Sequence, residues 1–152
     1  FVHYTKDCTE ILFLDSSKMM LQTANWKFKK LNKTGKLKLA PDTKVRFQVS
    51  DAENLNIIAD DSFDTVIDSF GLCSFDDPVK AVKEMGRVCK PDGKIVLLEH
   101  GRSNFHTWLN NYILDPYVKA HAWKYGCNWN RDIPDIVTEA GLYIESEKRK
   151  HF

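Results

Sequence analysis

Hydrophobic and polar positions along the chain fall into blocks that predict alternating strands and helices. Glu10-Ile-Leu-Phe-Leu-Asp15 is a short apolar run that ends in an acid, which is typical of a buried parallel strand. Thr43 to Ser50 instead alternates apolar Val45, Phe47 and Val49 with polar residues. Because one face of such a strand is buried and the other is wet, we expect it at a sheet edge.

The clearest unit lies between Val45 and His100. A strand over Phe63 to Ser69 precedes a helix that Asp77-Pro78 opens, with an acid at the cap and proline in the first turn. A turn at Lys90 to Gly93 then leads to Lys94 to Glu99, whose continuous apolar run favours a central strand. This order predicts a parallel β-α-β unit, and ligands usually bind at the carboxyl ends of such strands.

The remaining blocks extend this arrangement on both sides. They are a helix after Ser17 with an apolar face from Met20 to Trp26, a helical turn within Asp51 to Ser62, two aromatic helical pieces over Ser103 to Tyr125, a helix from Ile133 closed by Gly141, and a last strand over Leu142 to Lys148. The order predicts an α/β fold, a doubly wound Rossmann-like sheet in a single domain over residues 1–152. The aromatic residues of the two pieces either cover a site or belong to the core.

Composition narrows the class of protein. The chain has 152 residues, 43% of them hydrophobic, and a net charge of +1. This balance gives no support for broad nucleic-acid binding, and the lysines between residues 27 and 38 are interpreted as a solvated surface. No apolar stretch is long enough to span a membrane. Cys8, Cys73, Cys89 and Cys127 form no C-x-x-C pair, so we expect a reducing compartment, no metal site, and packing roles for Cys73 and Cys127.

Acids and a glycine follow three of the predicted strands. Asp15 either accepts hydrogen bonds from ribose hydroxyls or caps the next helix. Asp51 and Ala52 either meet an adenine edge or form a turn. Gly71, in the segment Ser69 to Leu72 that Asp68 precedes, either lets a ligand approach the backbone or satisfies an unusual dihedral angle. Each residue alone is weak support for a nucleoside site.

Taken together, these positions resemble a class I S-adenosylmethionine-dependent methyltransferase of the UbiE/Coq5-like "methyltransferase type 11" set. The resemblance runs from about Ile11 to Glu99. The residues that carry it are Leu14-Asp15-x-Ser17-x-x-Met20-Leu21, Asp51-Ala52-Glu53-x-Leu55, Asp61-Ser62-Phe63-Asp64-x-Val66, Arg87-Val88-x-Lys90-Pro91-x-Gly93-Lys94 and Leu98-Glu99. Further on, Leu98 to Ser103 and Gly126 to Asp132 resemble the fungal mitochondrial inner-membrane methyltransferase-like proteins and their animal relatives.

The resemblance implies S-adenosyl-L-methionine as cofactor and gives each position a role. Asp15 would bind the ribose, with Ser16 and Met20 beside the adenosine, Asp51 and Ala52 at the adenine edge, and Ser69 and Gly71 near the methionine end. His100 is the predicted general base for an acceptor that must lose a proton. His121 is interpreted as a packing residue. The acceptor stays open between a quinone-like small molecule, a lipid, a thiol and a protein side chain, and no nucleic-acid partner is expected.

One family feature is missing. The family begins with a strand and a Gly-x-Gly-x-Gly loop, whereas Phe1 to Thr9 contains no glycine. The partner of the last strand is missing too. We therefore expect an N-terminally truncated chain with an incomplete sheet, inactive alone, from a mitochondrial inner-membrane protein whose membrane segment lies outside this chain.

Two other functions stay open from the sequence. One is a non-catalytic assembly or respiratory-chain maintenance factor that keeps the methyltransferase fold. The other is a nucleotide-binding oxidoreductase, since Asp15 would serve the ribose of a dinucleotide equally well. The pairing of Asp51-Ala52-Glu53 with Asp61-Ser62-Phe63-Asp64 favours the methyltransferase over the oxidoreductase.

Overall fold

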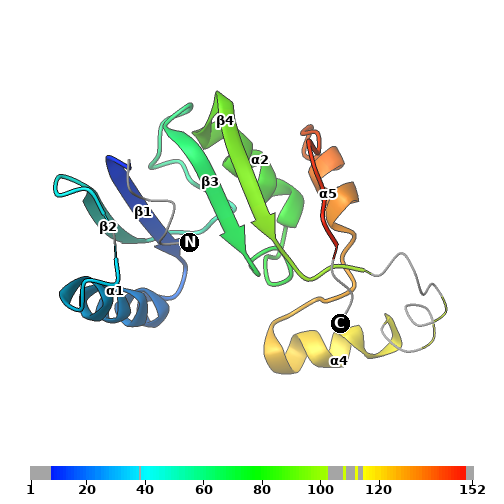
Figure 1. The fold of residues 1–152 in the computed structure, drawn as a ribbon. Helices are drawn as coiled ribbons and strands as arrows, with labels where there is room; N and C mark the ends of the chain where they lie inside the picture. Colours follow the sequence, from blue (N-terminus) through cyan, green and yellow to red (C-terminus); the bar gives the residue numbers. More distant parts are fainter. Residues whose placement is uncertain (1–7, 38, 103–107, 109–111, 113–114, 150–152) are drawn as a thin grey trace. The chain divides into compact units, whose positions relative to one another are not determined.

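The computed structural model describes residues 8–37, 39–102, 108, 112 and 115–149. The chain divides into two compact units, unit 1 (Phe1–Ala52) and unit 2 (Glu53–Phe152), each with its own two-stranded parallel sheet (Figure 1). The elements are β1 (Glu10–Asp15), α1 (Lys18–Lys33), β2 (Lys44–Val49), β3 (Phe63–Ser69), α2 (Pro78–Val88), β4 (Cys89–Leu98), α4 (Asp115–Tyr125) and α5 (Ile133–Glu139). Mixed strands and helices confirm the α/β class.

Unit 1 is a β-α-β unit in which α1 packs on both strands. β1 and β2 are parallel and pair without a register shift, from Glu10 opposite Lys44 to Asp15 opposite Val49. The ring of Phe47 stacks on its cross-strand neighbour Phe13, at 4.8 Å between centroids. These contacts confirm both predicted strands.

The helix of unit 1 begins where the sequence predicts and buries less than expected. Ser17 is the N-cap, and its Oγ accepts a hydrogen bond from the backbone N–H of Met20 at 3.3 Å. The predicted apolar face from Met20 to Trp26 is largely exposed, with these two side chains 56% and 63% exposed. Leu21 is the buried residue of this helix. The start of α1 was predicted correctly, whereas the burial of its apolar face was not.

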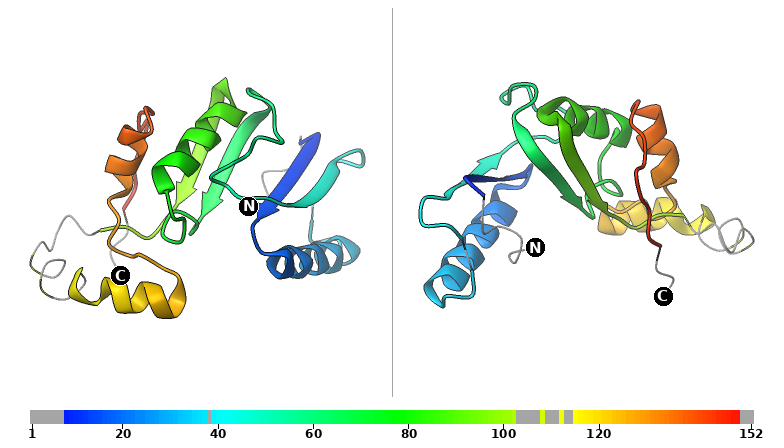
Figure 2. Two further views of the ribbon diagram at one scale, coloured as in Figure 1. Left: turned by 180° about the vertical axis from the view of Figure 1, so that it is seen from behind. Right: turned by 45° about the horizontal axis from the view of Figure 1, so that its top comes forward.

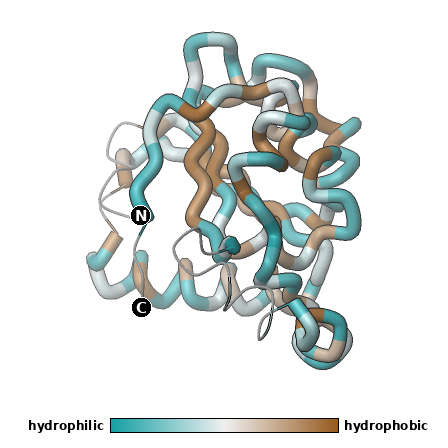
Figure 3. Tube along the Cα trace, turned by 90° about the vertical axis from the view of Figure 1, so that its right-hand side faces the viewer, coloured by the Kyte–Doolittle hydropathy of each residue, from teal (hydrophilic) through white to brown (hydrophobic). Residues whose placement is uncertain are grey.

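Unit 2 is a second β-α-β unit, and α2 covers one face of its sheet (Figures 1 and 2). β3 and β4 are parallel, with Thr65 opposite Lys94 and Ser69 opposite Leu98. Asp77 caps α2 by accepting from the N–H of Lys80, as the Asp-Pro signal predicts. The strands are largely hydrophobic and the turns that join the elements are mostly hydrophilic (Figure 3).

The predicted Lys-Pro-Asp-Gly turn lies within β4 as an irregularity of the strand. Phe63 pairs with Cys89 and Thr65 with Lys94, so four residues of β4 lie opposite one residue of β3. A side chain at Gly93 would meet the Sγ atom of Cys89 at 2.7 Å and a β3 carbonyl oxygen at 2.9 Å. Only glycine fits this close approach of two backbones.

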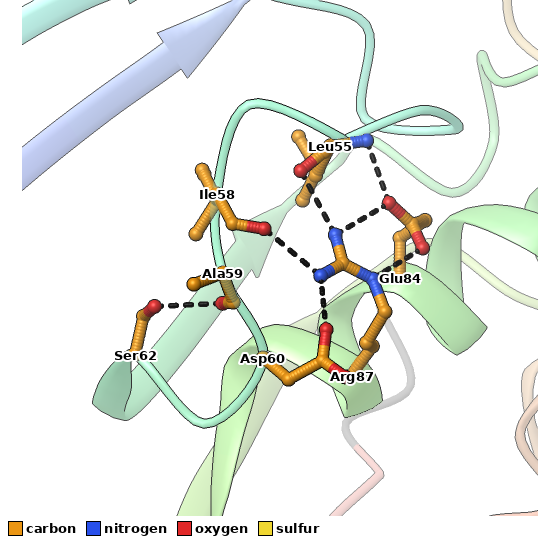
Figure 4. A network of polar contacts seen from close by, with 7 residues as sticks. All are labelled: Leu55, Ile58, Ala59, Asp60, Ser62, Glu84 and Arg87. Carbon is orange, nitrogen blue, oxygen red and sulfur yellow. Dashed lines mark hydrogen bonds and ion pairs between the residues drawn. The ribbon is translucent and has the colours of Figure 1, made fainter.

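Arg87 of α2 ties this helix to the segment that precedes β3 through a network of hydrogen bonds (Figure 4). The guanidinium of Arg87 donates to the carbonyl oxygens of Leu55 and Ile58 and to the carboxylates of Asp60 and Glu84, at 2.6–2.9 Å. Glu84 in turn accepts from the N–H of Leu55 at 2.6 Å. The predicted helical turn here is a single turn that a bond from Ile58 N–H to Leu55 C=O closes.

The last third of the chain agrees with the sequence in its helices and differs in its final segment. Asp132 caps α5, which Gly141 ends with a φ of +82°. Asp115-Pro116, predicted as a break between helical pieces, is the start of α4. The predicted strand over Leu142 to Lys148 is wrong, because in the described residues this segment has no strand to pair with. Its Glu145 contacts Lys94 of β4 as an ion pair.

Three further predictions concern the first aromatic piece, membrane-spanning segments and the place of β4 in its sheet. Most of the first aromatic piece, including Phe105, lies outside the described residues. Among the described residues, the helices are too short or too polar to traverse a lipid bilayer. β4, predicted to be central, pairs with β3 alone in the part of the chain that the structure describes.

Candidate functional site

The candidate residues of unit 1 gather at the carboxyl ends of its two strands. Asp15 is half-buried at the end of β1, and its Oδ1 atom accepts a hydrogen bond from the N–H of Ser17 at 2.7 Å. Ser16 and Met20 follow it and are both exposed. Asp15 thus supports the start of α1 without being its N-cap, which is Ser17. The carboxylate can accept more bonds, because its two oxygens offer about four acceptor sites.

Asp51 and Ala52 lie close to the same edge. The N–H of Ser50 donates to the carbonyl oxygen of Asp15 at 3.2 Å, which holds the two strand ends side by side. Asp51 is exposed and Ala52 is half-buried. The structure thus brings Asp15, Ser16 and Asp51 to one end of the unit 1 sheet, as the sequence predicts for parallel strands.

A hollow of unit 1 lies at the opposite end of β2. The second half of α1 and the residues around Pro41 line it, and Phe28, Leu39 and Val45 are its larger apolar side chains. None of the residues predicted to bind a cofactor lines this hollow.

In unit 2, Ser69 and Gly71 follow β3, at the carboxyl end of the second sheet. Ser69 is exposed. A side chain at Gly71 would meet the Oδ1 atom of Asp68 at 2.3 Å and the ring of Phe75 at 2.8 Å, so neighbouring side chains already require glycine here. This supports the structural interpretation of Gly71, and its predicted contact with a cofactor stays a prediction.

Two half-buried carboxyl groups, those of Asp68 and Glu99, meet beside Gly71. Glu99 follows β4, and its Oε1 atom accepts from the N–H of Gly71 at 3.1 Å. Burial and the neighbouring carboxyl group of Asp68 raise the pKa of Glu99 to about 7, and burial raises the pKa of Asp68 as well. Within the described residues, the Oδ2 atom of Asp68 and the Oε2 atom of Glu99 are buried without a hydrogen-bond partner.

Sequence reasoning named Asp68 and missed its partnership with Glu99. A signal was present, because both acids end neighbouring parallel strands. Asp68 lies opposite Leu97 in the register, so Glu99 follows only two residues further along the same edge. Acids that close adjacent parallel strands are expected to approach each other.

A second cluster joins His100 to two cysteines. Cys73 follows β3, His100 follows β4, and Cys127 follows α4. One ligand atom from each residue lies within 4.8 Å of the other two, and the Sγ atom of Cys127 is 3.9 Å from Nδ1 of His100. The expectation that the cysteines have no histidine partner is therefore wrong. The reason is sequence separation, since three distant segments supply the cluster.

His121, which contacts Cys127, has the packing role that the sequence predicts. The ring of His121 packs on Trp129 at 3.8 Å and on Tyr125 at 4.7 Å between centroids. Its Nδ1 atom lies 3.0 Å from the carbonyl oxygen of Cys127. His121 is a packing residue that supports the segment after α4.

Comparison with known proteins places the chain among methyltransferases. Residues 1–97 match the family model Methyltransf_11, described as a methyltransferase domain. The chain is 38% identical to "Methyltransferase OMS1, mitochondrial" of Saccharomyces cerevisiae, over 93% of this chain and 31% of that protein. It is 30% identical to the ubiquinone/menaquinone biosynthesis C-methyltransferase UbiE of Pasteurella multocida, over 93% of this chain and 47% of that protein.

Solved structures agree on the fold. The crystal structure of the YcgJ protein of Bacillus subtilis superposes with a TM-score of 0.64 at 24% identity, over 86% of this chain and 50% of that one. The chain spans about a third to about a half of the length of these relatives.

Proposed function

The chain belongs to the methyltransferase-domain family Methyltransf_11, and on this premise we propose that the whole protein transfers a methyl group from S-adenosyl-L-methionine to an acceptor. This chain would carry part of the cofactor site. The cofactor, when bound, supplies an electrophilic methyl group on a sulfonium. The protein then needs mainly to align that group with a nucleophile, because proximity and orientation supply much of the rate.

The observation that carries the proposal is the placement of Asp15. A half-buried carboxylate at the carboxyl end of a parallel strand is where nucleoside-binding α/β folds accept bonds from ribose hydroxyls. Its bond from Ser17 fixes the carboxylate and leaves acceptor sites for such hydroxyls. The residues present therefore fit the ribose of the cofactor.

The other assignments follow the same strand ends, unit by unit. In unit 1 we assign Ser16 and Met20 to the surroundings of the adenosine, and Asp51 with Ala52 to the adenine edge. In unit 2 we assign Ser69 and Gly71 to the methionine end. The support for the first group is its common position at one end of the β1–β2 sheet.

His100 stays the predicted general base for an acceptor that loses a proton. It follows β4 and is exposed, which suits contact with a substrate. Its ring lies 4.4 Å from the ring of Phe70, so its orientation is restrained. An acceptor that attacks without losing a proton would not need it.

We further propose that the first strand with its glycine-rich loop, and the last strand, lie outside this chain. In the described residues, β1 pairs with β2 alone and β3 with β4 alone, so each sheet has strand edges without a partner. Ile67, Val96 and Leu98 of the unit 2 sheet are 40–58% exposed. Unpaired strand edges and exposed apolar side chains support an incomplete sheet.

A mitochondrial location is proposed on the strength of one relative. The similar protein of Saccharomyces cerevisiae is described as mitochondrial, and the chain matches it over most of its own length. Attachment to the inner membrane would depend on a segment other than the described helices.

Calorimetric titration of the full-length protein with S-adenosyl-L-methionine tests the proposal. Asp15→Asn keeps an oxygen for the Ser17 N–H and removes the charge, so we expect binding about 10- to 100-fold weaker from the loss of charge-assisted bonds. Asp42→Asn, at an exposed turn of the same unit, is the matched control and should bind as the wild type does.

Three outcomes separate the alternatives. No heat of binding in the full-length protein would overturn the cofactor assignment. Unchanged binding in Asp15→Asn would overturn the role of Asp15 alone. Binding without methyl transfer to any of a quinone, lipid, thiol or protein acceptor would favour the non-catalytic assembly factor.

A further inference from the structure

We propose that Cys73, His100 and Cys127 form a binding site for a zinc ion, with the three side chains as ligands and a fourth position open to solvent. The inference does not rest on the proposed methyl transfer, but it replaces the general-base role of His100. All four cysteines in the described residues are free thiols, so both sulfur ligands are available. Two thiolates and one imidazole are the donor set that zinc prefers among divalent ions in proteins.

The spacing of the ligand atoms suits a tetrahedral ion. Zinc bonds of about 2.3 Å to sulfur and about 2.0–2.1 Å to nitrogen put neighbouring ligand atoms about 3.5–3.8 Å apart. The Sγ atom of Cys127 is 3.9 Å from Nδ1 of His100, and all three ligand atoms lie within 4.8 Å of one another. Small rotations of the side chains are enough to close the site.

Backbone contacts hold two of the ligand segments together without a metal. The N–H and the side-chain amide of Asn128 both donate to the carbonyl oxygen of Cys73, at 2.7 and 3.3 Å. The N–H groups of Ser74 and Phe75 bond back to Gly71, so Cys73 lies in a tight turn. The residue after Cys127 is thus tied directly to Cys73.

Aromatic and histidine contacts orient the other ligands. The ring of Phe70 restrains the imidazole of His100, and His121 lies against the carbonyl oxygen of Cys127. The guanidinium of Arg131 also donates to the carbonyl oxygens of Leu72 and Phe75, on either side of Cys73. Supporting contacts of this kind fix metal ligands in known sites.

Packing alone explains only part of this arrangement. Cys73 is 2% exposed, as expected of a cysteine in a core. Cys127 is only half-buried and His100 is exposed, so neither is required to fill the interior at this point. Their convergence on Cys73 from two other segments is what a metal site requires.

Bound zinc would change the role of His100. An imidazole nitrogen that coordinates a metal cannot take up a proton, so His100 would be a ligand instead of the general base. The ion would also join the segment after α4 to the carboxyl ends of β3 and β4. Because His100 is exposed, the fourth position would face water or an added ligand.

Titration of the reduced, metal-free full-length protein with Co²⁺ tests the site. We expect one equivalent to bind per chain, with sulfur-to-cobalt charge-transfer absorption in the near ultraviolet and intense visible bands of a tetrahedral ion, both removed by added Zn²⁺. Cys73→Ser, His100→Asn and Cys127→Ser should each weaken binding about 100-fold or more. Cys8→Ser, in unit 1, is the matched control and should bind one equivalent.

A second measurement guards against variants that misfold. X-ray absorption of the zinc-loaded wild type should give two sulfur neighbours at about 2.3 Å and nitrogen or oxygen at about 2.0–2.1 Å. Absence of charge-transfer absorption, or a zinc shell of oxygen and nitrogen alone, would overturn the proposal. So would undiminished binding in Cys127→Ser. Cofactor titration of the same samples reports separately on the proposed methyl transfer.

Discussion

Units 1 and 2 share one plan, two parallel strands with a helix packed on them, yet they bury very different amounts of apolar surface. Among the described residues of unit 1, Leu21 is the buried apolar side chain, whereas unit 2 buries Leu55, Leu72, Cys73, Ala81, Val82, Met85, Val88, Cys89, Ile136 and Val137. The difference lies in what covers the helix. α2 packs between its sheet and α5, while the outer side of α1 leaves Met19 and Trp26 exposed.

The comparison teaches that a β-α-β unit is not a core by itself. One helix on two strands shields a single face of each element, and a second layer is needed to remove the rest from water. In unit 2 this layer comes from α5 and from the segment that Arg87 ties to α2. Unit 2 is therefore expected to be the more stable of the two.

The largest expected effect comes from replacing one buried leucine in each unit by alanine. Leu72 is 0% exposed and Leu21 is 7% exposed. Leu72→Ala should lower the free energy of unfolding of unit 2 by about 3–5 kcal/mol, and Leu21→Ala that of unit 1 by about 2 kcal/mol, since the sparser surroundings of Leu21 leave a smaller cavity. Native-state hydrogen exchange, followed on peptides from each unit, measures both losses. Equal losses would break the comparison.

A smaller effect is expected from the arginines that link segments in each unit. Arg87→Leu should destabilise unit 2 by about 2 kcal/mol, because the carbonyl oxygens of Leu55 and Ile58 lose a charged donor. Arg46→Leu removes an exposed ion pair with Glu10 and should cost less than about 1 kcal/mol. Urea unfolding with fragment-resolved exchange compares the two. A larger loss for Arg46→Leu would contradict the ranking.

The smallest effect is a dependence on acid in unit 2. The hydrogen bond from Arg87 lowers the pKa of Glu84 below its ordinary value of 4.5. The unfolded chain therefore binds the proton first as pH falls, so this stabilisation is present above about pH 4.5 and is lost as pH drops through the folded pKa. Since Glu84 is partly exposed, we expect a loss of less than about 1 kcal/mol.

Exchange of the α2 amides at successive pH values measures this loss. Glu84→Gln has no charge to lose, so its stability should change less between about pH 6 and pH 3 than that of the wild type. An identical pH dependence in wild type and Glu84→Gln would assign the effect to other acids.

Signals within a few residues of sequence predicted the helix ends correctly, but they did not predict which segments pair with one another. Ser17, Asp77 and Gly141 mark helix ends through bonds or dihedral angles within a few residues, and each functions as predicted. The strand predicted over Leu142 to Lys148 failed because a strand needs a partner, which its own sequence does not reveal. The single domain over residues 1–152 stays a prediction.

The candidate site shows the same limit. The edge that carries Asp15 and Asp51 was predictable, because parallel strands bring their carboxyl ends together. The meeting of Cys73, His100 and Cys127 was not, since each lies 27 positions from the next and no periodic pattern links them. The cofactor contacts themselves remain predictions.

Phe70 has a consequence for anyone who engineers this protein. Its φ of +60° lies in the left-handed region, which costs a residue with a side chain about 1 kcal/mol and costs glycine almost nothing. The same residue supplies the ring that restrains His100. Selecting variants for heat resistance would favour glycine at position 70, whereas selecting variants for metal binding would favour phenylalanine there.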